Sequence, residues 1–319
     1  MNILVTGGCG YVGSVLVPEL IKKRYKVTVV DTQWFGNKLK RHKNLKNLKK
    51  DIRNIDEISL KGIDTVIHLA GIVNDPGADL NAVLSWEINV LATRQLIEKA
   101  TKNSVKQFIY ASSGSVYGVK KEKNVTENLD LLPISTYNKT KMITENVLTS
   151  FKDKIKIHCI RPATVCGVSP RMRFDVSVNI LTMHALKKKI ITVFGGKQVR
   201  PNIHIKDMAD VYLHFLKNPQ LPGGAYNAGF ENISIIDIAK KIKKYINAKI
   251  VIKKSNDPRS YRQSSTKLLK TGFVPKYKVE DAIKEIIQAY SLSVKKIEKS
   301  SFTLQWMKKL KLHKSTKVK

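Results

Sequence analysis

The residues with the clearest chemical potential are Tyr137 and Lys141, four positions apart in the segment YNKTK. At that spacing two side chains share one face of a helix. An ammonium group beside a phenol favours the phenolate and lowers the phenol's pKa from about 10 toward neutrality. The pair therefore predicts a general base for the proton of an alcohol, or the acid for a ketone in the reverse direction.

A third polar residue, Ser113, strengthens this prediction. It lies 24 residues before Tyr137, just beyond a predicted strand at residues 106–111. A hydroxyl at the carboxyl end of a strand is placed to share a substrate hydroxyl with Tyr137. A Tyr-Lys pair alone also arises by chance, in which case it is a solvated lysine beside a packed tyrosine. The added serine favours a catalytic group.

A glycine-rich turn near the start of the chain predicts where a cofactor binds. Residues 2–6 are apolar and rich in β-branched side chains, the segment TGGCGYVG follows, and residues 14–23 have the apolar spacing of a helix. Residues 26–30 form a second apolar run. Strand, glycine turn, helix and strand in this order make the dinucleotide-binding βαβ unit, with phosphates at the start of the helix.

The acidic residue Asp31 ends the second run, 18 residues after Gly13. A carboxylate at that place binds a ribose 2′-hydroxyl and repels a 2′-phosphate, so NAD is favoured over NADP. The alternative is an ordinary glycine-rich turn, which the flanking elements and the acid disfavour.

Further strands and helices alternate along the first half of the chain. Strands are expected at residues 63–70, 106–111 and 156–161, and helices at 79–101 and 136–150. This alternation predicts an α/β fold with a doubly wound parallel sheet.

Beyond that region the alternation breaks, and we expect a second unit. The predicted dinucleotide-binding domain spans residues 1–165, with 195–217 returning to it, and a smaller interleaved α/β substrate-binding domain comprises 166–194 and 218–292. The Lys-rich residues 293–319 are expected to form a loosely ordered basic tail. Weak contact of this tail with an anionic surface is a minor alternative.

The composition limits the possible partners and compartment. The net charge is +33, but only ten of the 58 basic residues are arginine and the lysines are spread along the chain. No RNA-binding signature accompanies them, so a general lysine bias is preferred over specific nucleic-acid binding. Three cysteines without paired spacing suit the reducing cytoplasm and predict no metal site. No apolar run is long enough for a membrane span, and no signal peptide is expected.

Taken together, the motifs resemble those of the extended short-chain dehydrogenase/reductase family, in its NAD-dependent nucleotide-sugar epimerase/dehydratase group. The match covers residues 2–290, through TGGCGYVG, Asp31, DIR, HLAG, SSGSVYG, YNKTK, RPATVCG and VRPNIHIKD. The resemblance implies a Rossmann fold, a nucleotide-diphosphate sugar as substrate, and a homodimer packed through the helices at 79–101 and 136–150.

The resemblance also implies a role for individual residues. Ser113, Tyr137 and Lys141 are expected to be catalytic. The expected NAD-binding residues are Gly7, Gly10, Tyr11, Val12, Gly13, Asp31, Asp51, Ile52, Ala70, Gly71, Asn89, Tyr137 and Lys141. Arg200 is expected to bind the diphosphate of the substrate, and Ser113 is expected to bind its sugar. Asn179 and Arg259 are candidates for the same clamp, with a helix hydrogen bond and a surface ion pair as their alternatives.

Two departures from the family pattern narrow the predicted reaction. Gly114 and Ser115 stand where related 4,6-dehydratases have an acidic pair, so dehydration is disfavoured, whereas decarboxylation stays open. Cys166 replaces a tyrosine, which indicates a different sugar pocket. The predicted function is epimerisation of a nucleotide sugar through a 4-keto intermediate. The alternatives are a net 4-keto-sugar reductase or sugar-nucleotide dehydrogenase, and a nucleic-acid-binding member of the fold.

Overall fold

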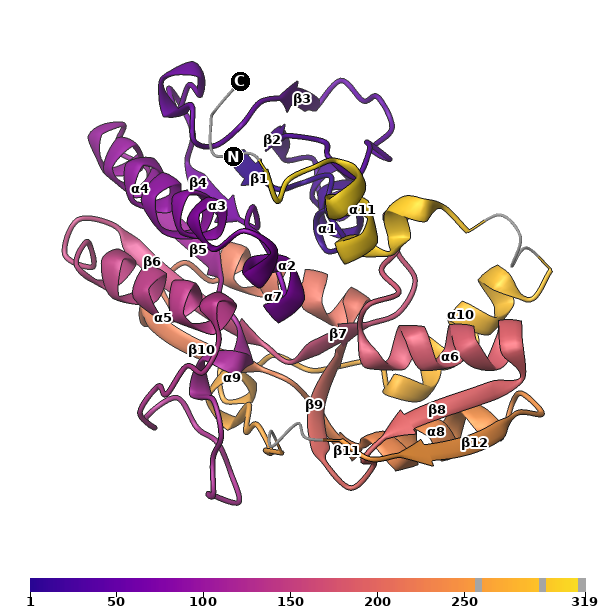
Figure 1. Ribbon diagram of the computed structural model, residues 1–319. Helices are drawn as coiled ribbons and strands as arrows, with labels where there is room; N and C mark the ends of the chain where they lie inside the picture. The colour runs from indigo at the N-terminus through magenta and orange to yellow at the C-terminus, as the bar shows by residue number, and fades with distance from the viewer. Residues whose placement is uncertain (256–259, 293–296, 315–319) are drawn as a thin grey trace.

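The computed structural model describes residues 1–255, 260–292 and 297–314, and a seven-stranded sheet forms its centre (Figure 1). The strand order is β10-β6-β5-β4-β1-β2-β3, and all neighbouring strands are parallel. The strands are β1 (Asn2–Thr6), β2 (Lys26–Asp31), β3 (Leu45–Lys49), β4 (Thr65–His68), β5 (Gln107–Ala111), β6 (Lys156–Pro162) and β10 (Gly224–Ala228). The predicted doubly wound α/β fold is confirmed.

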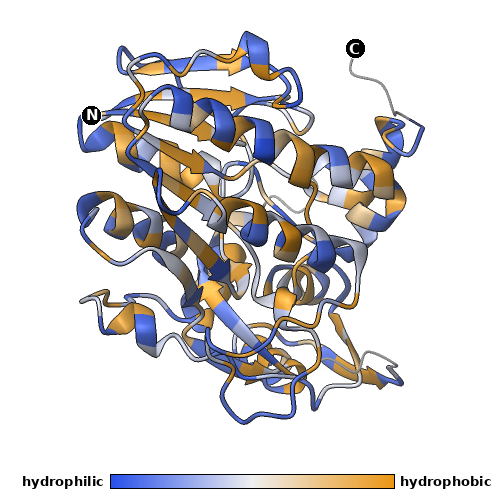
Figure 2. Cartoon of the chain, turned by 90° about the vertical axis from the view of Figure 1, so that its left-hand side faces the viewer, coloured by the Kyte–Doolittle hydropathy of each residue, from blue (hydrophilic) through white to orange (hydrophobic). Residues whose placement is uncertain are grey.

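Helices cover both faces of this sheet, which explains why its strands are apolar on both sides. Ile3 and Val5 of β1 pack in one cluster with α1 (Gly13–Lys22) and α7 (Ile205–Lys217). Leu4, which points to the opposite face, packs in another cluster with α4 (Ala92–Lys102). The helix α5 (Thr136–Thr149) adds Leu148 to that second cluster. Hydrophobic residues run along several strands of the sheet in Figure 2.

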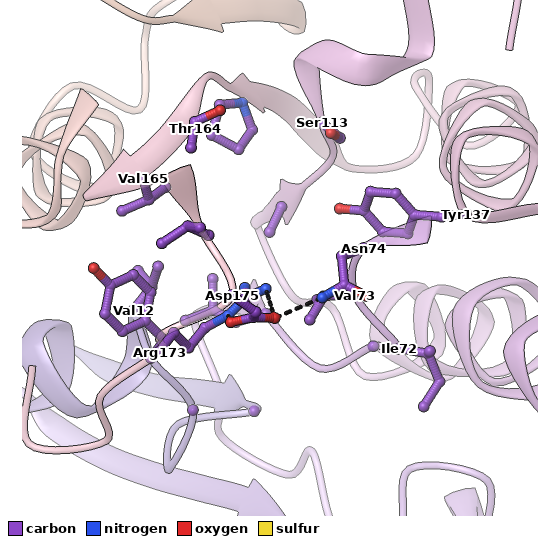
Figure 3. A pocket seen from close by; sticks show the side chains of 18 of the residues that line it. Val12, Ile72, Val73, Asn74, Ser113, Tyr137, Thr164, Val165, Arg173 and Asp175 are labelled. Atoms are coloured by element: carbon purple, nitrogen blue, oxygen red, sulfur yellow. Dashed lines mark hydrogen bonds and ion pairs between the residues drawn. The ribbon is translucent and has the colours of Figure 1, made fainter. Parts of the chain in front are cut away.

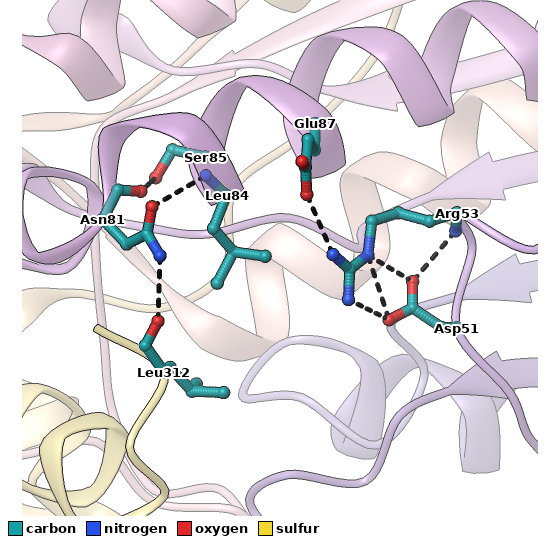
Figure 4. A network of polar contacts seen from close by, with 7 residues as sticks. All are labelled: Asp51, Arg53, Asn81, Leu84, Ser85, Glu87 and Leu312. Atoms are coloured by element: carbon teal, nitrogen blue, oxygen red, sulfur yellow. Dashed lines mark hydrogen bonds and ion pairs between the residues drawn. The ribbon is translucent and has the colours of Figure 1, made fainter. Parts of the chain in front are cut away.

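The helix expected at residues 79–101 is confirmed from residue 82 onward, where α3 (Ala82–Trp86), a π-helical turn (Glu87–Leu91) and α4 follow one another without a break. Its predicted start is wrong, because a separate helix, α2 (Asp75–Leu80), ends at Leu80 and Asn81 interrupts the chain. Asn81 has an extended backbone, and its side chain accepts a hydrogen bond of 3.0 Å from the Leu84 N–H at the start of α3 (Figure 4). An N-cap of this kind satisfies a free N–H and starts a new helix.

A second, smaller region lies beside the sheet and has its own core. It contains a three-stranded sheet, β11-β9-β7, and a two-stranded sheet, β12-β8. Its strands are β7 (Thr164–Cys166), β8 (Ile190–Phe194), β9 (Val199–His204), β11 (Glu231–Ser234) and β12 (Lys249–Lys253). Its helices are α6 (Ser177–Lys188), α8 (Ile235–Lys243) and α10 (Val279–Tyr290). Short helical segments elsewhere are Ile55–Glu57, Gly114–Tyr117, α9 (Thr266–Leu269), Lys299–Ser301 and α11 (Thr303–Lys309). None of the helices in the described residues is long and apolar enough to cross a membrane.

The predicted boundary of the smaller domain fails at β10. This strand lies within residues 218–292 but pairs with β6 as the edge of the large sheet. Tyr226 and Ala228 of β10 are buried in the cluster that contains Ile3 and Val5, so burial of these side chains draws the strand to the main core.

Residues 297–314 of the predicted basic tail are better ordered than expected, whereas its residues 293–296 and 315–319 lie outside the described residues. Within the C-terminal segment, defined here as residues 297–314, Met307 is 4% exposed and packs in the cluster of α4. The Trp306 Nε1–H donates to the carbonyl of Trp34 over 2.6 Å, and Asn81 Nδ2 donates to the carbonyl of Leu312 over 3.1 Å. The apolar residues of this segment are therefore held against the first half of the chain, where α11 packs against α2.

Candidate active site

A pocket of about 700 Å³ runs along the carboxyl edge of the large sheet. It is lined by residues that follow four of the central strands, among them Gly10 after β1, Asp31 at the end of β2, Ala70 after β4 and Ser113 after β5. The loop between β7 and α6 closes the opposite side with Arg173 (Figure 3). Open α/β sheets bind ligands at this edge.

The glycine turn after β1 is built for close approach of a ligand to the backbone. Gly7 has a φ of +71°, and a Cβ atom there would lie 2.6 Å from the Ala70 nitrogen. A Cβ at Gly13 would lie 2.6 Å from the Gly7 carbonyl oxygen, so only glycine permits α1 to start this close to β1. No side chain caps the start of α1. Its positive end therefore fits an anionic diphosphate, as a dinucleotide requires.

The carboxylates predicted for the adenosine end also line the pocket. Asp31 accepts hydrogen bonds from the N–H groups of Cys9 (3.0 Å) and Gln33 (2.6 Å). Burial raises the pKa of Asp31, and these two bonds act in the opposite direction. Asp51 forms an ion pair of 2.9 Å with Arg53, which also pairs with Glu87 (Figure 4). Both carboxylates are thus held in fixed positions at the pocket wall.

The remaining predicted NAD-binding residues fall into two groups. Those that line the pocket are Gly7, Gly10, Tyr11, Val12, Gly13, Ile52, Ala70, Gly71, Tyr137 and Lys141. Asn89 does not line it. Its side chain is buried, accepts from the Ile72 N–H over 2.8 Å, and donates to Thr140 Oγ1 over 3.0 Å. Asn89 therefore fixes the turn after β4 against α5 rather than facing the ligand space.

Tyr137 and Lys141 lie in the first two turns of α5, opposite Ser113. In Figure 3 the hydroxyl groups of Tyr137 and Ser113 point into the same space. The Lys141 ammonium donates to the carbonyl of Ala111 over 2.7 Å and lies 5.9 Å from the centre of the Tyr137 ring. Ser113 Oγ is 2.7 Å from Ser115 Oγ. The three predicted catalytic residues are thus brought together at the pocket wall.

The pKa of Tyr137 was predicted to be lowered, and this prediction is wrong, because the pKa is raised. Burial raises the pKa of Tyr137, while the hydrogen bond with Ser113 and the charge of Arg173 act to lower it. Burial also lowers the pKa of Lys141 from 10.5 to about 8, against the nearby carboxylate of Glu145. Lys141 is buried and Tyr137 is half-buried at the pocket wall, and for both the loss of hydration outweighs the attraction that sequence spacing suggests.

Behind Lys141 lies a buried ion pair that the sequence did not indicate. Arg161 Nη2 is 2.7 Å from Glu145 Oε2, and Ser112 donates a hydrogen bond to the same carboxylate. Arg161 also donates to the Tyr117 hydroxyl over 2.7 Å. Residues on β6, α5 and the loop after β5 are thereby tied together, which holds the elements that carry Ser113, Tyr137 and Lys141 in place.

The predicted substrate residues have different outcomes. Arg200, on β9, lines the pocket. Asn179 is fully buried, donates to the Tyr11 hydroxyl over 3.0 Å, and accepts from the Gly167 N–H over 3.0 Å. It lies behind the pocket lining and holds the loop that precedes α6. Arg259 lies outside the described residues.

The loop before α6 lines the pocket with a polar group that the sequence motifs did not indicate. Arg171, Arg173 and Asp175 come from the segment RMRFD, and Asn74 faces them from the turn after β4. Arg173 Nη2 is 2.8 Å from Asp175 Oδ2, which also accepts from Asn74 Nδ2 over 2.6 Å (Figure 3). The signal that could have revealed this group is the closely spaced charged residues of RMRFD, which follow soon after the RPATVCG turn.

Comparison with known proteins agrees with this geometry. The model of the NAD dependent epimerase/dehydratase family matches residues 3–229. The chain belongs to this family. The resemblance found in the sequence motifs is thereby confirmed, and NAD is the cofactor that the family uses.

Relatives within the NAD dependent epimerase/dehydratase family span most of the chain. A Bacillus subtilis protein named as an uncharacterized UDP-glucose epimerase is 35% identical over 262 residues, which are 76% of this chain and 81% of that protein. The structure of Thermotoga maritima UDP-glucose 4-epimerase with UDP-glucose has a TM-score of 0.83 and 27% identity, covering 92% of this chain and all of that one. A Bacillus cereus UDP-glucuronic acid 4-epimerase with UDP-glucuronic acid and NAD has a TM-score of 0.79 and 27% identity, covering 91% and 100%.

Proposed function

We propose that this protein is an NAD-dependent 4-epimerase of a UDP-sugar. The observation that carries the proposal is the meeting of Ser113, Tyr137 and Lys141 at the wall of a pocket that also contains the uncapped start of α1. The relatives named above act on UDP-glucose or UDP-glucuronic acid, which supports a UDP-sugar as the substrate class.

Each catalytic residue has a defined task in this proposal. Tyr137 takes the proton of the sugar's C4 hydroxyl and later returns it, Ser113 binds the C4 oxygen, and Lys141 stabilises the deprotonated Tyr137. NAD held by the glycine turn and Asp31 would supply reversible hydride acceptance at C4. A 4-keto sugar that is free to rotate in the pocket would then be inverted at C4 with no net oxidation. The enclosed pocket keeps water from the keto intermediate.

Dehydration is disfavoured because the site has no room for an acid at residue 114. A Cβ atom at Gly114 would lie 2.7 Å from Gln263 Oε1 and 3.1 Å from the Pro162 carbonyl oxygen. Gln263 is itself fixed by donating to the Arg161 carbonyl over 2.7 Å. An acidic side chain at residue 114 would therefore collide with Gln263, which disfavours the acidic pair of the dehydratases and supports epimerisation.

We further propose that Arg200 binds the diphosphate of the substrate and that the protein is a homodimer. Arg200 brings a guanidinium, a good partner for a diphosphate, to the substrate side of the pocket. Val83, Trp86 and Leu91 are large apolar residues with 57%, 37% and 55% exposure along α3 and the π-helical turn. Exposed apolar residues on adjoining turns support a subunit interface there.

The test is turnover of UDP-glucose, UDP-galactose and UDP-glucuronic acid by the purified protein with no cofactor added. Formation of a mixture of C4 epimers would establish the epimerase and recycling of bound NAD. Conversion only with stoichiometric NAD or NADH would make it a dehydrogenase or reductase instead. The matched control is Tyr137→Phe, which keeps the ring and removes the hydroxyl. We expect it to lower kcat by about 10²–10⁴-fold, and unchanged kcat would exclude Tyr137 as the base.

A further inference from the structure

Arg171 presents a buried and incompletely paired cation to the pocket. Its side chain lines the pocket, although the residue is only 5% exposed. The buried Nε has no hydrogen-bond partner within the described residues. Nη2 contacts Thr303 Oγ1 over 3.3 Å, and the guanidinium carbon lies 4.0 Å from the centre of the Phe35 ring. The ring fixes the plane of the guanidinium, while Nε is left without an acceptor.

The surrounding contacts place Arg171 beside the start of α1. Ser169, two residues earlier, donates to the Tyr11 carbonyl over 2.7 Å, and the Arg171 N–H contacts Ser14 Oγ at 3.4 Å. Phe35 belongs to the segment that follows β2 and lines the pocket next to Asp31. The side chain therefore extends from the first turn of α1 toward the end of β2, the two points that a bound dinucleotide connects.

Burying the Arg171 guanidinium in this way is energetically unfavourable unless an anion binds to it. Burial lowers the pKa of Arg171 to about 9; Arg173 acts in the same direction, and Asp175 and Asp31 act against both. A buried guanidinium with an unused donor loses hydration that its partners do not replace. The start of α1 supplies only about half an elementary charge, so a diphosphate placed there has charge left for a second partner.

We propose that Arg171 is a cofactor-binding residue that donates to the diphosphate of NAD. The cofactor is then held from both halves of the chain: by the glycine turn of the first and by the loop before α6 of the second. Through Thr303, the C-terminal segment supports the same side chain. Such a contact slows the departure of NAD and keeps it bound between turnovers.

The experiment measures binding rather than turnover, so it stands apart from the test of the proposed epimerase. NAD is removed from the purified protein, and Kd values for NAD, ADP-ribose and adenosine are measured by calorimetry for the parent and for Arg171→Gln. We expect the variant to bind NAD and ADP-ribose at least about tenfold more weakly, since a charge-assisted bond is lost. Adenosine, which lacks the diphosphate, is expected to bind within about twofold of the parent.

Arg24→Gln is the matched control because it removes one exposed arginine just beyond the far end of α1. Its Kd values should equal those of the parent. Parent-like affinity of Arg171→Gln for ADP-ribose would overturn the proposal, and so would an equal loss for adenosine, which would place the contact on the nucleoside.

If Arg171→Gln does not fold, Arg171→Lys keeps the charge and should bind ADP-ribose with intermediate affinity. If both variants fail to fold, the parent protein decides the question. In an arginine-labelled sample, ADP-ribose but not adenosine must then shift the guanidinium resonances of Arg171, which are identified by its contact with the Phe35 ring. The absence of that shift would overturn the proposal.

Discussion

Asn74 Nδ2 donates a hydrogen bond of 2.6 Å to Asp175 Oδ2 across the pocket, and thereby joins the turn after β4 to the loop before α6 (Figure 3). Asn74 has a φ of +62°, and its Oδ1 accepts from the Gly77 N–H over 2.8 Å. One side chain thus caps α2 and bridges the two walls of the site.

The two tasks of Asn74 can be separated by Asn74→Asp. The substitution keeps the oxygen that caps α2 but replaces the amide donor by an oxygen facing Asp175. We expect the two walls to part more readily, and NADH to dissociate several-fold faster. Stopped-flow fluorescence of NADH release measures this rate. A rate equal to that of the parent would show that the bridge does not control access to the pocket.

Lys141 predicts a specific pH dependence of stability. Its pKa falls from 10.5 in the unfolded chain to about 8 in the fold. Between these values the unfolded chain holds more protons, so this group makes the free energy of unfolding rise with pH. We expect the difference in stability between the parent and Lys141→Met to shift in favour of the parent by about 2 kcal/mol from pH 8 to 9.5. Urea unfolding at several pH values tests this, and a flat difference would contradict the buried ammonium.

Substitutions at Gly7, in the glycine turn, and at Gly36, after β2, form a matched pair that tests why glycine is needed in the turn. Both have positive φ, +71° and +84°, but a Cβ at Gly7 would meet Ala70 whereas none of the described atoms lies within 4 Å at Gly36. We expect Gly7→Ala to cost about 2–4 kcal/mol and Gly36→Ala about 1 kcal/mol, since only the first adds a clash to backbone strain. Urea unfolding gives both values. Equal losses would mean that strain alone explains the requirement for glycine at position 7.

The docking of the C-terminal segment is tested by Met307 and Leu310. Met307 is buried against α2, where its sulfur lies 3.6 Å from the Cβ position of Gly77, whereas Leu310 is 37% exposed. We expect Met307→Ala to destabilise the protein by about 2–4 kcal/mol and Leu310→Ala by less than about 1 kcal/mol. If both substitutions have the small effect, the segment contributes little to stability in solution.

Features that depend on residues close together in the sequence were predictable. The βαβ unit and the order of strands and helices were predictable because glycine spacing and apolar periodicity act over a few residues. Tyr137 and Lys141 were predictable for the same reason, since four positions on a helix define one face. At residue 81 the predicted helix start failed, because the Asn81 side chain caps a new helix within an apparently continuous pattern, and the short helix capped by Asn74 was not predicted.

Other properties arise only when distant segments meet. Asn89 and Asn179 have the residue type of ligand-binding amides, yet the fold uses both to bind its own backbone. The C-terminal segment is basic along the sequence, but its apolar side chains find a surface on the first half of the chain.

The sequence by itself predicted most of the elements of the large sheet and identified Ser113, Tyr137 and Lys141 as candidate catalytic residues. Only the tertiary structure decided their electrostatic state and the composition of the opposite pocket wall. Tyr137 has a raised pKa because packing against segments distant in sequence removes part of its hydration, an effect that neighbours in sequence do not report. Arg171 faces the start of α1 because a loop more than 150 residues later packs against it. Desolvation and long-range packing belong to the folded chain as a whole, and so the site is complete only in three dimensions.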